Sequence, residues 1–240
     1  MRFNTIIGIS LVVSTLTGCG GGGADGSSNV SGSETTVSNL SFPVDSTLGN
    51  YLDLSRSSTF RATSQGRSFE FTYAFNPQSD TTFEGMPSKR TRVTGTLSEN
   101  GAELDASVVN VFFNEGPFSL NGYTTENDPD NQNYFVSIDN SIAPAFAKVG
   151  SQGPIAQMNA FSDSSKNVPT GRDIYSYSVE PDTATTAFIC LNSNTFDVNN
   201  TQIFSSKECA KIDASGVFIG FRFITTPFEN GVEQEAITFE

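Results

Sequence analysis

An alternation of apolar and polar side chains with a period of two runs through most of the chain from Thr59 onward. Its clearest stretch places four aromatic residues on one parity, with small or polar residues between them. These aromatic residues are Phe69, Phe71, Tyr73 and Phe75. Only an extended strand sends alternate side chains to opposite faces, so the pattern predicts a half-buried strand with a large aromatic face.

Two further stretches alternate in the same way and are apolar on parts of both faces. They are 108–113 (VVNVFF) and 217–223 (VFIGFRF), and in the second we expect Val217, Ile219, Phe221 and Phe223 to share the buried face. A strand covered on both faces has neighbours on both sides. We therefore expect these two strands to lie centrally in a sheet.

Turn signals separate the predicted strands. Asn100-Gly101 and Asn230-Gly231 each stand between two alternating stretches, and Asn-Gly readily adopts the positive φ angles of a two-residue hairpin loop. Helix signals are few, and only 50–56 and 142–149 suggest short helices. The sequence therefore predicts an all-β fold with little helix, built as a mainly antiparallel sandwich or barrel.

A weak internal similarity relates residues 59–118 to residues 165–228. Gly66-Arg67 parallels Gly171-Arg172, and Leu104–Ser107 parallels Ile212–Ser215. A duplication would give two related β units, but the second block turns more naturally at 213–216 than at the position that matches Asn100-Gly101. We therefore leave open whether residues 46–240 form one β domain or two related units.

The first 18 residues have the features of a secretory leader. Arg2 supplies a positive charge, and Ile6–Leu16 form an apolar run of 11 residues, short of the ~20 that a membrane-spanning helix needs. Leu16-Thr17-Gly18-Cys19 follows at once and resembles the lipobox of bacterial lipoproteins, [LVI]-[AST]-[GA]-Cys, at every position. The resemblance covers the leader alone.

That resemblance implies a sequence of modifications at Cys19. In the family the cysteine thiol takes a diacylglyceryl group, the leader is cleaved before the cysteine, and the new amine usually receives a further acyl chain such as palmitate. Residues 19–45 would then form a lipidated tether, rich in Gly and Ser at its start, with an average reach of about 25 Å. Gly20 replaces the Asp that commonly retains such proteins in the inner membrane, so the resemblance implies the outer membrane.

The cysteine count agrees with an oxidising compartment. Of the three cysteines, Cys19 would carry lipid, which leaves Cys190 and Cys209 as a pair. We expect this pair to form a disulfide, worth roughly 3 kcal/mol for a loop of about 20 residues. A metal site is the alternative, but two distant thiols without any histidine do not complete one.

Charge and residue types exclude several functions. The formal net charge of −13 disfavours nucleic acid and anionic lipid headgroups as partners, since both require a cationic surface. The absence of histidine removes the Ser-His-Asp, Cys-His and HExxH arrangements. A hydrolase that uses only carboxylates remains open because the chain has 26 acidic residues, although it lacks the Trp platforms usual in glycan sites.

Two stretches are weak candidates for ligand sites. Asp128, Asp130 and Asp139 loosely resemble the spacing of a calcium loop, but the Gly and the bidentate Glu of that loop are missing, which favours an ordinary solvated loop. The aromatic face of 69–75 is interpreted as the core of a sheet. Its alternative is the lining of a barrel cavity for an apolar ligand.

These observations favour a lipid-anchored protein of the cell envelope that works as a non-enzymatic binding or interaction module, without a cofactor. Its partners would be the membrane, through the N-terminal lipid, and an envelope protein or surface component. The alternatives are a carrier or sensor of an apolar small ligand and, third, a carboxylate-only hydrolase.

Overall fold

The structure is a computed structural model that describes residues 38–64, 66–126 and 134–239. Its order of strands and one helix is β1 (Ser41–Pro43), α1 (Asp45–Asp53), β2 (Arg56–Ser64), β3 (Arg67–Phe83), β4 (Met86–Glu99), β5 (Ala102–Glu115), β6 (Phe118–Glu126), β7 (Tyr134–Asn140), β8 (Phe146–Lys148), β9 (Gln152–Phe161), β10 (Pro169–Pro181), β11 (Thr186–Asp197), β12 (Gln202–Asp213), β13 (Phe218–Glu229), β14 (Val232–Glu233) and β15 (Ile237–Phe239). The predicted all-β class is confirmed.

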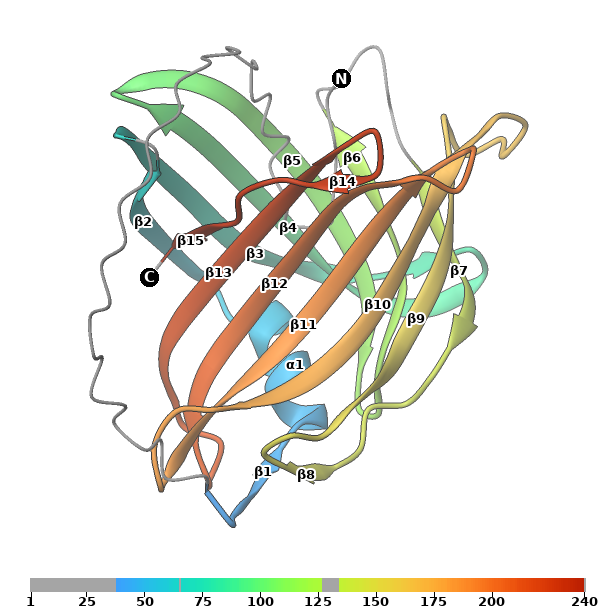
Figure 1. The fold of residues 1–240 in the computed structure, drawn as a ribbon. Coiled ribbons are helices and arrows are strands. Elements are labelled where there is room, and N and C mark those ends of the chain that lie inside the picture. Colours follow the sequence, from blue (N-terminus) through green and yellow to red (C-terminus); the bar gives the residue numbers. More distant parts are fainter. Residues whose placement is uncertain (1–37, 65, 127–133, 240) are drawn as a thin grey trace.

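One antiparallel sheet makes up nearly the whole molecule (Figure 1). Its strand order is β14-β13-β12-β11-β10-β9-β7-β6-β5-β4-β3-β2. The short strand β15 pairs with β13 and lies against β2, so the two ends of the sheet approach each other. The sheet is therefore a nearly closed barrel, and β1 and β8 form a separate two-stranded sheet.

The predicted aromatic face of β3 points into the barrel. Phe69, Phe71, Tyr73 and Phe75 are at most 2% exposed. The ring of Phe71 lies 5.3 Å from that of Phe223 on β13 and 5.8 Å from that of Phe239 on β15. Rings from opposite ends of the sheet thus meet inside the barrel. Burial of such large apolar side chains is the main source of stability available to this fold.

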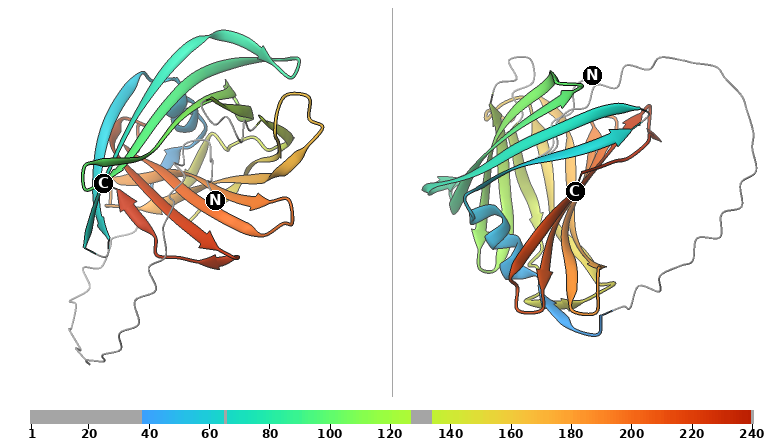
Figure 2. Two further views of the ribbon diagram at one scale, coloured as in Figure 1. Left: turned by 90° about the horizontal axis from the view of Figure 1, so that it is seen from above. Right: turned by 90° about the vertical axis from the view of Figure 1, so that its left-hand side faces the viewer.

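Helix α1 lies inside the barrel at the end where β1 is found (Figures 1 and 2). Leu48, Tyr51 and Leu52 are spaced along one helical face and are all buried. The ring of Tyr51 contacts those of Phe75 on β3 and Phe221 on β13. The helix therefore fills the interior between strands that are far apart in the sequence.

Both predicted Asn-Gly hairpins are confirmed. Asn100-Gly101 joins β4 to β5 with φ angles of 50° and 82°, and Asn230-Gly231 joins β13 to β14 with φ angles of 51° and 79°. Asn and Gly are the residues that adopt this left-handed region at least cost.

Three local expectations were wrong. The helix predicted at 50–56 occupies 45–53 instead, because its apolar spacing starts at Leu48. The helix predicted at 142–149 is absent, since the backbone of 146–148 pairs with β1 as strand β8. Ordered structure also begins before residue 46, where the tether was expected to end, because 41–43 form β1.

The buried face predicted for 217–223 holds only in its second half. Phe223 is 3% exposed, whereas Val217 and Ile219 are 59% and 51% exposed. The partners of β13 on the side away from β12 begin at Phe223, so the start of the strand extends beyond the closed part of the barrel. Alternation in the sequence cannot indicate where a strand leaves the sheet.

The two blocks of the internal similarity align in their first strand and not beyond it. Gly66-Arg67 leads into β3, and Gly171-Arg172 lies near the start of β10, at the same end of the barrel. Leu104–Ser107, in contrast, lie within β5 near its start, whereas Ile212–Ser215 end β12 and enter the following turn. These later segments occupy different positions in the barrel.

Candidate functional site

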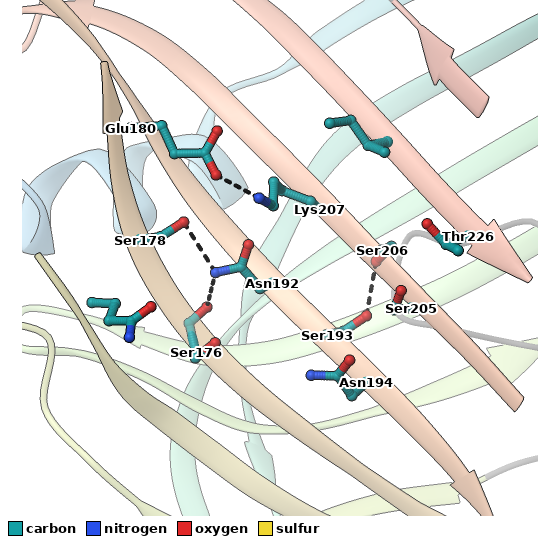
Figure 3. A pocket seen from close by; sticks show the side chains of 12 residues that line it. Ser176, Ser178, Glu180, Asn192, Ser193, Asn194, Ser205, Ser206, Lys207 and Thr226 are labelled. Atoms are coloured by element: carbon teal, nitrogen blue, oxygen red, sulfur yellow. Dashed lines mark hydrogen bonds and ion pairs between the residues drawn. The ribbon is translucent and has the colours of Figure 1, made fainter. Parts of the chain in front are cut away.

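The outer face of β10–β13 carries a groove with a volume of about 450 Å³ (Figure 3). Six small or polar side chains define it, and we call it the polar groove. They are Ser176, Ser178, Asn192, Asn194, Ser205 and Lys207. Among the described residues, no aromatic side chain lines it.

Strand register brings these residues together from distant parts of the chain. Ser176 lies opposite Asn192, and Asn192 lies opposite Lys207 on the next strand. Asn194 lies opposite Ser205 in the neighbouring row. Residues directly opposite in adjacent strands share a face, so three strands contribute to one polar surface. The alternate residues, such as Tyr175, face the core.

Asn192 forms the centre of the polar groove. Its Nδ2 donates hydrogen bonds to Ser178 Oγ at 3.2 Å and to the carbonyl oxygen of Ser176 at 3.4 Å. Its Oδ1 is buried and accepts no hydrogen bond from the part of the chain that the structure describes. An unmet buried acceptor costs about 1–3 kcal/mol, so the fold does not fully satisfy this amide.

A covalent and ionic cluster closes one end of the polar groove. Cys190 and Cys209 lie directly opposite each other and form a disulfide, which confirms the predicted pairing. Glu180 forms ion pairs with both Lys207 and Arg222. The guanidinium of Arg222 lies 4.1 Å from the centre of the Phe188 ring, a cation–π contact. The cluster holds Lys207 in place at the edge of the groove.

The chemistry of this cluster does not support a metal site. The ligand atoms of Glu180, Cys190 and Cys209 all lie within 4.8 Å of one another. Metals bind the thiolate form of cysteine, and both sulfurs are already joined in the disulfide. Only one carboxylate is then left.

Two acidic residues are buried inside the barrel. Tyr123 and Tyr175 donate hydrogen bonds to Asp173 Oδ2 at 2.6 and 3.0 Å. Burial raises the pKa of Asp173 to about 6, although these hydrogen bonds act in the opposite direction. The sequence did not indicate this buried acid. Asp173 can be assigned to the inner face only when the position of its strand, β10, in the barrel is known.

Glu208 is the second buried acid, at 5% exposed. Burial raises its pKa to about 8, against the lowering effects of the Tyr51 hydroxyl, which donates a hydrogen bond at 3.2 Å, and of the nearby Arg56 charge. The Arg56 guanidinium lies 3.9 Å from the centre of the Tyr51 ring and is held by cation–π contact. Both acids are enclosed, so neither faces a surface where a substrate could reach it.

The remaining predicted site residues are found in different places. Phe69, Phe71, Tyr73 and Phe75 pack against other rings, as the core interpretation expects. Asp139 is exposed at the end of β7, whereas Cys19, Asp128 and Asp130 lie outside the described residues. The structure therefore brings together Cys190 and Cys209 among the predicted residues, and it adds a groove that the sequence did not indicate.

Comparison with known proteins gives no relative. No family model, no curated protein and no solved structure matches the chain. Within the described ranges, no helix is long and apolar enough to cross a membrane. A function is therefore inferred from the geometry of this molecule and from its sequence motifs.

The raised pKa of Glu208 predicts a specific pH dependence of stability. In the unfolded chain a glutamate ionises near 4.5, whereas in the barrel the pKa is about 8. The stability contribution is therefore full below pH 4.5 and is lost as the pH rises through 8, a change on the order of 5 kcal/mol. We expect Glu208→Gln to flatten the decline of the free energy of unfolding between pH 5 and pH 8.5, measured by chemical denaturation.

The exposed residue Glu233 provides a matched control for this experiment. Glu233→Gln should retain the wild-type pH profile. Parallel profiles for the wild type and Glu208→Gln would contradict the assignment.

Proposed function

We propose that this chain is a lipid-anchored protein of the cell envelope, held on the outer membrane through Cys19, and that its barrel is a non-enzymatic binding module. The polar groove is the contact surface in this proposal, and its occupant is a polar segment of another envelope protein. The observation that carries the proposal is the groove itself, which gathers amide and hydroxyl groups from three strands on an outer face.

The chemistry of the polar groove suits a peptide segment. Asn and Ser side chains both donate and accept hydrogen bonds, as the exposed backbone of a peptide requires. Lys207 and Glu180 add one charge of each sign at the edge. The absence of aromatic rings from the lining disfavours a sugar, since sugar sites usually include an aromatic platform.

Ring packing beside the predicted ligand face disfavours the alternative of an apolar carrier. The rings of Tyr73 and Phe60 lie 5.4 Å apart, and the ring of Phe221 lies 5.4 Å from that of Tyr73 on another side. Side chains from three strands therefore occupy the space beside the predicted ligand face. Asp173 and Glu208 are likewise buried, so they do not form the open pair of carboxylates that a glycosidase needs for hydrolysis.

Photocrosslinking in living cells tests the polar groove. We expect a photoreactive residue at Asn194 to capture a discrete partner protein, and Asn192→Arg in the same chain to abolish the capture by filling the groove. Thr72 is the matched control, because it is exposed on the outer face of a strand elsewhere in the barrel. Equal capture from Asn194 and Thr72, or capture that survives Asn192→Arg, would refute the assignment of this surface.

Metabolic labelling tests the lipid anchor separately. A clickable palmitate analogue should label the wild type, because the resemblance to the lipobox makes Cys19 the acylated residue. The Cys19→Ser variant should remain unlabelled and lose its sedimentation with membranes. A labelled variant, or an unlabelled wild type, would reject the anchor.

A further inference from the structure

Large apolar side chains are exposed at one end of the barrel, the end that holds β1 and α1. Each of them is between 42% and 66% exposed. We call this surface the apolar end, and it comprises Leu40, Leu54, Ile142, Phe146, Val217 and Phe218.

Several contacts bring β1, β8 and the turn before β13 together at this end. Pro43 on β1 lies opposite Phe146 on β8. The Cγ of Pro43 also lies within contact distance of Gly216, in the turn before Phe218. Phe218 and Leu54 line the same small pocket beside Gly216. Figure 1 shows β1, β8 and the turn between β12 and β13 at this end.

The turn before β13 does not require an apolar side chain at Val217. Asp213 Oδ1 sets the turn by accepting hydrogen bonds from the backbone N–H groups of Ser215 and Val217 at 2.8 and 3.1 Å. The side chain of Val217 takes no part in this geometry. At the opposite end the exposed apolar residues, such as Val168, Val198 and Val232, lie singly in three separate connections or strand ends. An apolar cluster on a surface, unlike single residues, indicates a contact with another body.

The place where the described chain begins suggests what that body is. The described chain begins at Ser38, directly before β1 at the apolar end, and Cys19 precedes Ser38 by 19 residues. From its composition, a stretch of this length is expected to span about 25 Å on average. An acyl group on Cys19 would therefore keep the apolar end within about 25 Å of the membrane on average.

We propose that the apolar end rests on the lipid surface that anchors the protein. The inference depends on the proposed lipid attachment of Cys19. A tether converts a weak contact into an intramolecular one with a high effective concentration, so a few partly exposed side chains suffice. The lipid surface is zwitterionic, since a chain of net charge −13 gains nothing from anionic headgroups.

This contact fixes the orientation of the barrel. The turns between β9 and β10 and between β11 and β12 lie at the opposite end, so they point away from the membrane. The polar groove lies on the side wall and stays open to a partner. Insertion of the apolar end also gives the protein a second membrane contact besides its lipid, as stable anchoring of lipidated proteins requires.

Lipid crosslinking tests the orientation. The full lipidated protein is reconstituted in nanodiscs of phosphatidylcholine, with p-benzoylphenylalanine placed at Phe146 or Phe218. Both side chains are partly exposed, so the benzoyl group that the probe adds to the ring can extend into solvent or lipid. We expect phospholipid adducts at least fivefold more abundant than from the same probe at Val198 or Val232, measured by mass spectrometry, and no increase when anionic lipid is added.

The outcomes separate this proposal from the proposed anchor. Membrane sedimentation and palmitate labelling of the same sample report whether the anchor is present. Suppose that the protein is anchored but forms equal lipid adducts from both ends, or forms protein–protein adducts in place of lipid adducts. Either result overturns the proposal that the apolar end rests on lipid and leaves the proposed anchor intact. A protein that acquires no lipid overturns both proposals.

Discussion

The meeting of aromatic rings from β3 with rings from β13 and β15 is the contact on which the rest of the structure depends. Phe71 touches both Phe223 and Phe239, and Tyr73 touches Phe221. These residues are about 150 positions apart in the sequence, and their contact brings the two ends of one sheet together. Without it, the sheet would expose its apolar face and its edge strands, both of which promote aggregation.

In the proposed function, recognition takes place on the outer surfaces of the barrel. Rings, α1 and the enclosed side chains of Arg56 and Glu208 occupy the interior. The outer wall of β10–β13 then carries the polar groove, and the end near β1 carries the exposed apolar side chains. The chemistry of each surface matches its proposed contact. The polar groove would contact a polar protein segment, and the apolar end would contact lipid.

Features that depend on neighbouring residues could be read from the sequence, whereas features that depend on strand register could not. The alternation at 69–75 and the Asn-Gly hairpins are local, and both were predicted correctly. Cys190 and Cys209 were paired by elimination, without knowledge of their strands. Asn192 and Lys207, however, face each other only because β11 and β12 pair in one register. The same limit hid the burial of Glu208, whose neighbours Tyr51 and Arg56 come from the other end of the chain.

The central claim is that this barrel binds through its outer wall and not through its interior. Hydroxyl-radical footprinting of the protein in intact envelopes, compared with the purified protein, tests this claim most directly. The account predicts that Ile224, at the polar groove, is protected in the envelope, while Leu104, exposed on β5, keeps its reactivity. Equal labelling of Ile224 in both samples, or protection confined to Leu104, would contradict it.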